Sequence, residues 1–152
     1  MNADKKPNLT MLCDFYELTM GNGYFQCGYK DRITYFDVFF RTVPDNGGFA
    51  ICAGLDQFID YVENLHFSEE DIGYLRGKGL FSEEFLDYLR HFKFTGDIWA
   101  IPEGTPIFPR EPILTVRAPA IQAQLIETFA LLCLNHQSLI ATKANRIVRA
   151  AE

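Results

Sequence analysis

The stretch ITYFDVFF, residues 33–40, is the clearest β-strand in the sequence. It consists of β-branched and aromatic residues, with Asp37 as its only charge. An almost continuous apolar run of this length predicts a strand that is buried on both faces. Arg41 follows directly, and the turn-forming residues PDNGG at 44–48 come soon after it.

Helices are predicted on both sides of this strand. Before it, apolar residues recur at a spacing of three to four over residues 10–26, at Leu12, Phe15/Tyr16, Thr19/Met20 and Gly23/Tyr24. Gly21 and Gly23 within this helix indicate that another element packs closely there. After the strand, an apolar stripe predicts a helix over 55–65. Ser68 and Ser82, each followed by acidic residues, predict N-caps for two short helices at about 69–76 and 83–91.

A second β region follows, with short strands expected at 98–101, 106–108 and 113–116. Five prolines interrupt this region, and we expect them to prevent long hydrogen-bonded ladders. Pro119 then precedes one long helix, expected from about residue 120 to the end. The elements do not alternate as regular strand–helix–strand units, so the sequence predicts an α+β fold rather than a doubly wound sheet.

The final helical pattern runs to residue 152 without a Gly, Asn or Pro stop signal. A natural domain usually closes with a helix cap, and we therefore expect the chain to be cut within this helix. The apolar stripe of the helix predicts partners that the chain itself does not supply.

The composition excludes several classes of protein. The 152 residues carry 14 basic and 20 acidic side chains, a net charge of −6, which argues against non-specific nucleic-acid binding. No apolar run is long enough for a membrane span, and residues 1–7 carry no secretory signal. The four cysteines are scattered without a CxxC pair and are expected to be reduced core thiols. We expect a cytoplasmic protein that binds neither nucleic acid nor membrane.

Motifs for known chemistry are scarce. His66, His91 and His136 lack metal-ligand spacing, and neither a phosphate-binding glycine loop nor a GxSxG nucleophile occurs. We therefore predict no metal ligand and no catalytic acid, base or nucleophile. Two pieces remain as binding candidates, DFY at 14–16 and FFR at 39–41, because a Tyr ring can stack on a flat heteroaromatic ligand and an Arg can bind phosphate oxygens.

These two pieces resemble the N-terminal part of nicotinate phosphoribosyltransferases when they are taken in order with other short motifs. The matching stretches are CDFYELTM (13–20), GY (23–24), FDVFFR (36–41), GGF (47–49), AGL (53–55), PEG (102–104), ET (127–128), LN (134–135), Ser138 and ATKANR (141–146). Cys13 stands where the family has Thr, which removes any hydroxyl contact at that position.

The resemblance implies a division of the chain and a larger whole. Members of the family are several hundred residues long, so the chain resembles the N-terminal α/β domain of a type II phosphoribosyltransferase plus the helix leading into an α/β barrel. Residues 1–9 would be a flexible N-terminus, residues 10–119 the α/β domain, and residues 120–152 the helix toward the missing barrel. The barrel residues, including a histidine that ATP phosphorylates, would lie beyond residue 152.

The resemblance also implies a reaction. Nicotinate and phosphoribosyl pyrophosphate would give nicotinate mononucleotide and pyrophosphate in NAD salvage, with ATP hydrolysis and Mg²⁺. Tyr16 would stack on nicotinate, Asp14 would help to place that segment, and Arg41 would contact a phosphate. These side chains would reach the active site of the other subunit in a head-to-tail homodimer. The chain alone is expected to be inactive.

Two alternatives stay open. A nicotinamide or quinolinate phosphoribosyltransferase would share the architecture, and the residues that select the substrate would lie mostly outside this chain. A non-enzymatic α/β module could instead use its aromatic surface to bind a protein partner.

Overall fold

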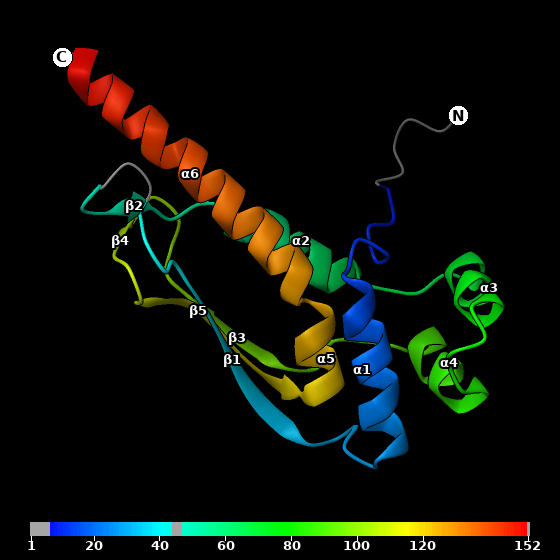
Figure 1. Cartoon of the computed structure of the whole chain (residues 1–152). Helices are drawn as coiled ribbons and strands as arrows, with labels where there is room; N and C mark the ends of the chain where they lie inside the picture. The colour runs from blue at the N-terminus through cyan, green and yellow to red at the C-terminus, as the bar shows by residue number, and fades with distance from the viewer. Residues whose placement is uncertain (1–6, 44–46, 152) are drawn as a thin grey trace.

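The computed structural model describes residues 7–43 and 47–151. Most of the expected flexible N-terminus and the middle of the expected turn at 44–48 therefore lie outside the described residues. The elements, in chain order, are α1 (Phe15–Gln26), β1 (Ile33–Phe39), β2 (Ala50–Ile51), α2 (Leu55–Asn64), α3 (Glu69–Gly77), α4 (Glu83–Arg90), β3 (Asp97–Ala100), β4 (Pro106–Ile107), β5 (Pro112–Pro119), α5 (Ala120–Leu125) and α6 (Glu127–Ala151). This mixture confirms the α+β prediction, and Figure 1 shows the sheet lying beneath the helices α5 and α6.

The main sheet is built around β5. Its order is β1–β5–β3 with antiparallel pairing throughout, and β2 and β4 form a separate two-stranded sheet. The expectation of only short strands in the proline-rich region is wrong, because β5 is a central strand of eight residues. Pro112 and Pro119 lie at its two ends, where a missing N–H costs the ladder little.

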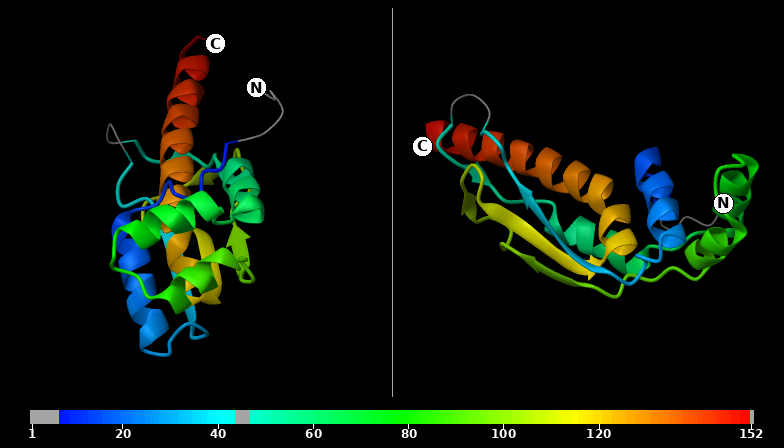
Figure 2. Two further views of the ribbon diagram at one scale, coloured as in Figure 1. Left: turned by 90° about the vertical axis from the view of Figure 1, so that its right-hand side faces the viewer. Right: turned by 60° about the horizontal axis from the view of Figure 1, so that its bottom comes forward.

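The predicted burial of β1 on both faces is also wrong. Tyr35 is 66% exposed, and Ile33, Phe36 and Phe39 are exposed as well. The physical reason is the position of β1 at an edge of the sheet, where it pairs only with β5 and α5 lies against it. Figure 2 shows α6 along one face of the sheet, and α3 and α4 beyond the end of the sheet.

The buried face of α1 differs from the predicted one. Glu17, Leu18, Gly21 and Asn22 are its buried residues, whereas the apolar positions expected to form the stripe, such as Phe15 and Met20, are exposed. The close approach predicted at the helix glycines is confirmed for Gly21. A Cβ there would lie 3.3 Å from Phe85 Cζ and 3.4 Å from Ile121 Cγ2.

The expected caps of the short helices are present. Ser68 and Asp71 form a reciprocal capping box at α3, and the Ser82 hydroxyl accepts a hydrogen bond from the Phe85 N–H at α4. Arg90 joins the two helices through its ion pair with Glu69.

The long final helix is divided. Ile126 separates α5 from α6, so the prediction of one unbroken helix from residue 120 is wrong. The buried side of α6 includes Phe129, Cys133, Ser138 and Thr142, while much of the predicted stripe is exposed, with Ile147 at 61%. None of the described helices, α6 included, combines the length and apolar character that crossing a bilayer requires.

Polar side chains fasten the start of α2 to the rest of the fold. Glu103 Oε1 accepts hydrogen bonds from the N–H groups of Gly54 and Leu55, each at 2.6 Å. Ser138 of α6 hydrogen-bonds both the N–H and the carbonyl of Ala53. Gly54 has φ 100°, and a Cβ on it would lie 2.5 Å from the Cys133 carbonyl oxygen, so only glycine fits there. The PEG and AGL motifs are thus one structural unit, a carboxylate capping a helix from another loop.

We expect Glu103→Ala to lower the free energy of unfolding by about 1–2 kcal/mol, because the first N–H groups of α2 lose their acceptor. Urea denaturation monitored by far-UV circular dichroism measures this change. Glu63→Ala, at the exposed C-terminal end of the same helix, is the control and should leave stability within about 0.5 kcal/mol. Equal effects of the two substitutions would contradict the capping role.

Candidate functional site

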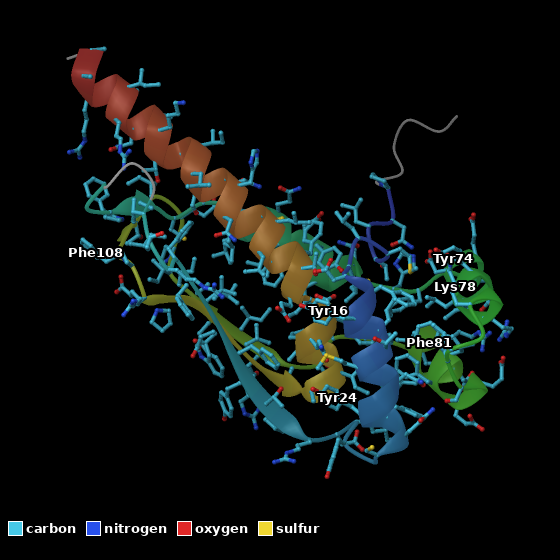
Figure 3. All side chains as sticks on the ribbon, in the orientation of Figure 1. Tyr16, Tyr24, Tyr74, Lys78, Phe81 and Phe108 are labelled. Atoms are coloured by element: carbon cyan, nitrogen blue, oxygen red, sulfur yellow. The ribbon has the colours of Figure 1, made fainter. Side chains whose placement is uncertain are left out.

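The junction between α1 and α6 places the aromatic candidate Tyr16. Its hydroxyl donates a hydrogen bond to Glu127 Oε1 at 3.1 Å, and its side chain is 43% exposed. Figure 3 shows Tyr16 where the first turn of α1 passes the start of α6. Partial burial, together with the hydrogen bond to Glu127, raises the pKa of the Tyr16 phenol to about 12. The ring is therefore accessible, and its hydroxyl stays protonated at physiological pH.

Glu17, the next residue of α1, is fully buried and caps α6. Its Oε1 accepts hydrogen bonds from the Thr128 N–H at 3.0 Å and from the Thr128 hydroxyl at 2.6 Å. The first N–H groups of a helix have no partner within the helix, so this carboxylate satisfies one of them from outside. The Thr128 oxygen in turn accepts from the Asp14 N–H at 3.2 Å. Asp14 thus contributes through its backbone, while its exposed side chain makes no cap at α1.

Burial dominates the electrostatics of this junction. Burial raises the pKa of Glu17 to about 7, opposed by the hydrogen bonds from Thr128 and reinforced by the charges of Glu127 and Asp14. The second oxygen, Oε2, is buried without a hydrogen-bond partner among the described residues, as is the Tyr61 hydroxyl. Burial likewise raises the pKa of the Cys13 thiol to about 12, so Cys13 is no nucleophile at neutral pH.

Arg41 lies elsewhere. It is exposed just beyond the end of β1, beside the loop in which the Arg110 N–H donates to the Phe40 carbonyl at 2.6 Å. Within residues 7–43 and 47–151, no hydrogen bond or ion pair engages its guanidinium. Phe108 of that loop lies at the left edge of the molecule in Figure 3, whereas Tyr16 lies near the centre, at the junction of α1 and α6. The structure therefore does not bring Tyr16 and Arg41 into one site within a single chain.

The described part of the chain holds no group of three His, Cys, Asp or Glu side chains arranged for a metal ion. Glu17 and Glu127 are already engaged with Thr128 and Tyr16. These residues therefore do not fit as a Mg²⁺ or ATP site.

The contacts of two residues of this junction, Glu17 and Glu127, were not predicted from the sequence. Glu17 was hidden because the apolar stripe was assigned to the wrong face of α1. Once Leu18 and Gly21 are placed in the core, the helical spacing turns Glu17 inward too, and that geometry would have identified it. Glu127 lies in the ET motif at 127–128, but its contact with Tyr16 was not predicted, because that contact depends on the break at Ile126.

The comparisons with known proteins point to one family. Residues 11–135 match the family model of the nicotinate phosphoribosyltransferase (NAPRTase) N-terminal domain. A nicotinate phosphoribosyltransferase of Mycobacterium tuberculosis is 44% identical over 144 residues, covering 93% of this chain and 30% of that protein. The corresponding protein of Bacillus subtilis is 41% identical over 143 residues, covering 94% and 29%. The chain thus spans about 30% of the length of these relatives.

The solved structures agree in fold. The crystal structure of human nicotinic acid phosphoribosyltransferase matches with a TM-score of 0.83 at 33% identity, covering 89% of this chain and 28% of that one. A nicotinate-nucleotide pyrophosphorylase from Pyrococcus furiosus matches with a TM-score of 0.70 over 99% of this chain and 32% of that one. Its identity of 21% makes this second match one of fold alone.

Buried Glu17 predicts a pH-dependent stability. Since the folded state holds a proton on Glu17 up to about pH 7 and the unfolded state only to about 4.5, this group favours folding below pH 4.5. This contribution to the free energy of unfolding falls as the pH rises from 4.5 and is lost once the pH passes about 7. At 1.36 kcal/mol per pH unit, the loss is on the order of 3 kcal/mol.

Chemical denaturation at a series of pH values from 4.5 to 8 measures this loss. Glu17→Gln cannot ionise, so its stability should vary less over that range, while Glu63→Gln should follow the wild-type curve. If the stability of Glu17→Gln falls with pH as steeply as that of the wild type, Glu17 is not the group responsible for the pH dependence.

Proposed function

The chain belongs to the nicotinate phosphoribosyltransferase family through its N-terminal domain, and from this premise we propose that it supplies binding groups to the enzyme reaction of that family. In the proposed reaction, nicotinate and phosphoribosyl pyrophosphate give nicotinate mononucleotide and pyrophosphate. The ribose C1–O bond breaks with its electron pair leaving on pyrophosphate, and the pyridine nitrogen forms the new C1–N bond. The step belongs to NAD salvage.

The family match over residues 11–135 is the observation that carries this proposal. The geometry around Tyr16 supports it, because the ring is accessible and the hydroxyl is tied to Glu127. A planar pyridine acid is the kind of ligand that stacks on such a ring. In the proposal, Tyr16 stacks on nicotinate, Asp14 helps to place the Tyr16 segment, and exposed Arg41 binds a phosphate oxygen.

A homodimer with shared active sites is the proposed assembly. Tyr16 and Arg41 lie apart in one chain, so a site that uses both draws them from two copies or uses each in a different contact. The proposed reaction also consumes ATP and uses Mg²⁺, and the groups that bind these lie outside the residues described above. No catalytic acid or base is proposed in this chain, and the proposed compartment is the cytoplasm.

We expect the full-length protein that contains this chain to form nicotinate mononucleotide when it is given nicotinate, phosphoribosyl pyrophosphate, ATP and Mg²⁺. Chromatographic detection of the product measures this activity. Nicotinamide and quinolinate, tested in the same way, should give little product. A preference for either one would favour the corresponding related enzyme, and turnover of none of the three would favour a non-enzymatic binding module.

Tyr16 and Arg41 should affect different substrates. Tyr16→Ala should raise the KM for nicotinate about tenfold through lost stacking, while Tyr16→Phe, which keeps the ring, should change it less. Arg41→Ala should instead raise the KM for phosphoribosyl pyrophosphate about tenfold or more, since a charged phosphate contact is lost. Steady-state kinetics with each substrate varied in turn measures both values, and each variant is the control for the other. An unchanged nicotinate KM in Tyr16→Ala would contradict the stacking role.

A further inference from the structure

Two neighbouring residues of α1 form hydrogen bonds with two neighbouring residues of α6. Tyr16 donates to Glu127, and Glu17 accepts from Thr128. The two pairs differ in their surroundings, because the first lies at the surface and the second is buried around a fully enclosed carboxylate. The buried pair has no role in the function proposed above.

The surface pair cannot hold the ring in place by itself. A hydrogen bond between a partly exposed phenol and a partly exposed carboxylate competes with water, and its net contribution is small. The Glu17–Thr128 pair lacks that competition, because Glu17 is inaccessible to water. It also uses the Thr128 N–H in the first turn of α6, so the pair fixes the backbone as well as a side chain.

We propose that Glu17, acting through Thr128, is a positioning residue that fixes the Tyr16 ring for ligand binding. The buried pair sets the register between the first turn of α1 and the start of α6. That register places Glu127 opposite the Tyr16 hydroxyl. The proposal rests on the proposed function of Tyr16, and Glu17 itself touches no substrate in it.

The charges around Glu17 explain why Thr128 is the critical partner. The ionisable groups that face Glu17 from its own segment, from α2 and from α6 are Cys13, Asp14, Tyr16, Tyr61 and Glu127. None of these groups is a cation. The two donors of Thr128 are therefore the groups that stabilise the carboxylate, and removing the Thr128 hydroxyl weakens the link directly.

The test is a double-mutant cycle on the full-length enzyme. Thr128→Val should raise the KM for nicotinate about three- to tenfold, with kcat and the KM for phosphoribosyl pyrophosphate nearly unchanged. In a Tyr16→Ala background the same substitution should have no further effect on the nicotinate KM, because the ring to be positioned is gone. Glu17→Gln keeps the acceptor oxygen and should stay close to wild type, whereas Glu17→Ala should behave like Thr128→Val. Thr115→Val, which removes a comparable hydroxyl contact to Asp37 on the sheet, is the matched control.

A second measurement does not depend on turnover. Nitration of tyrosines by tetranitromethane, followed by peptide mass spectrometry, reports the freedom of each phenol. Tyr16 should react several-fold faster in Thr128→Val than in wild type, while exposed Tyr74 of α3 should react at the same rate in both.

The outcomes separate the two proposals. Equal effects of Thr128→Val with and without Tyr16, or an unchanged rate of Tyr16 nitration, would overturn the positioning role. Absence of nicotinate turnover in wild type would count against the proposed function, and the nitration rates would then decide the positioning of the ring by themselves.

Discussion

The helix α6 begins inside the protein. The first N–H groups of a helix have no partner within that helix, so those of α6 need acceptors from elsewhere in the fold. Glu17 of α1 provides one of them through Thr128. Farther along α6, Ser138 and Thr142 hydrogen-bond the backbone at Ala53 and Ile51, so the same helix holds the β2–α2 segment. These polar contacts attach α1 and the β2–α2 segment to the same helix.

The motifs that first pointed to a family resolve into contacts between one another. CDFYELTM contacts ET through Tyr16 and Glu17, and PEG caps the helix that begins at AGL. The partners are far apart in the sequence, and each contact joins one polar side chain to a short piece of backbone or to another side chain. Glu103, Ser138 and Thr128 hydrogen-bond other parts of the protein, so the motifs also contain residues that hold the fold together.

Local chemistry determined what could be predicted from the sequence. The strand at 33–39 and the caps at Ser68 and Ser82 were predicted correctly, because their signals lie within a few residues. The burial of β1, the buried face of α1 and the break at Ile126 were predicted wrongly, because each depends on distant packing. The apolar residues of β1 indicate that the strand favours burial, but they do not indicate which element covers it. Tyr16 was a candidate from its own DFY stretch, and its role came from the resemblance to a family. Glu17 was missed because the apolar stripe of α1 was placed on the wrong face.

The acids around Tyr16 also bear on which ligand it can accept. Partial burial raises the pKa of its phenol to about 12, together with the hydrogen bond to Glu127 and the charges of Glu127, Glu17 and Asp14. In the proposed function, a phenolate at this position would add a negative charge beside a ligand that itself carries a carboxylate. The phenol is neutral at physiological pH, as an unshifted tyrosine also is, so the ring adds no charge and offers its face for stacking. Its hydroxyl is committed to Glu127 and cannot donate to the ligand at the same time. In the proposed function, Tyr16 therefore contributes shape and dispersion, and the charge of nicotinate has to be met by cations from another part of the assembly.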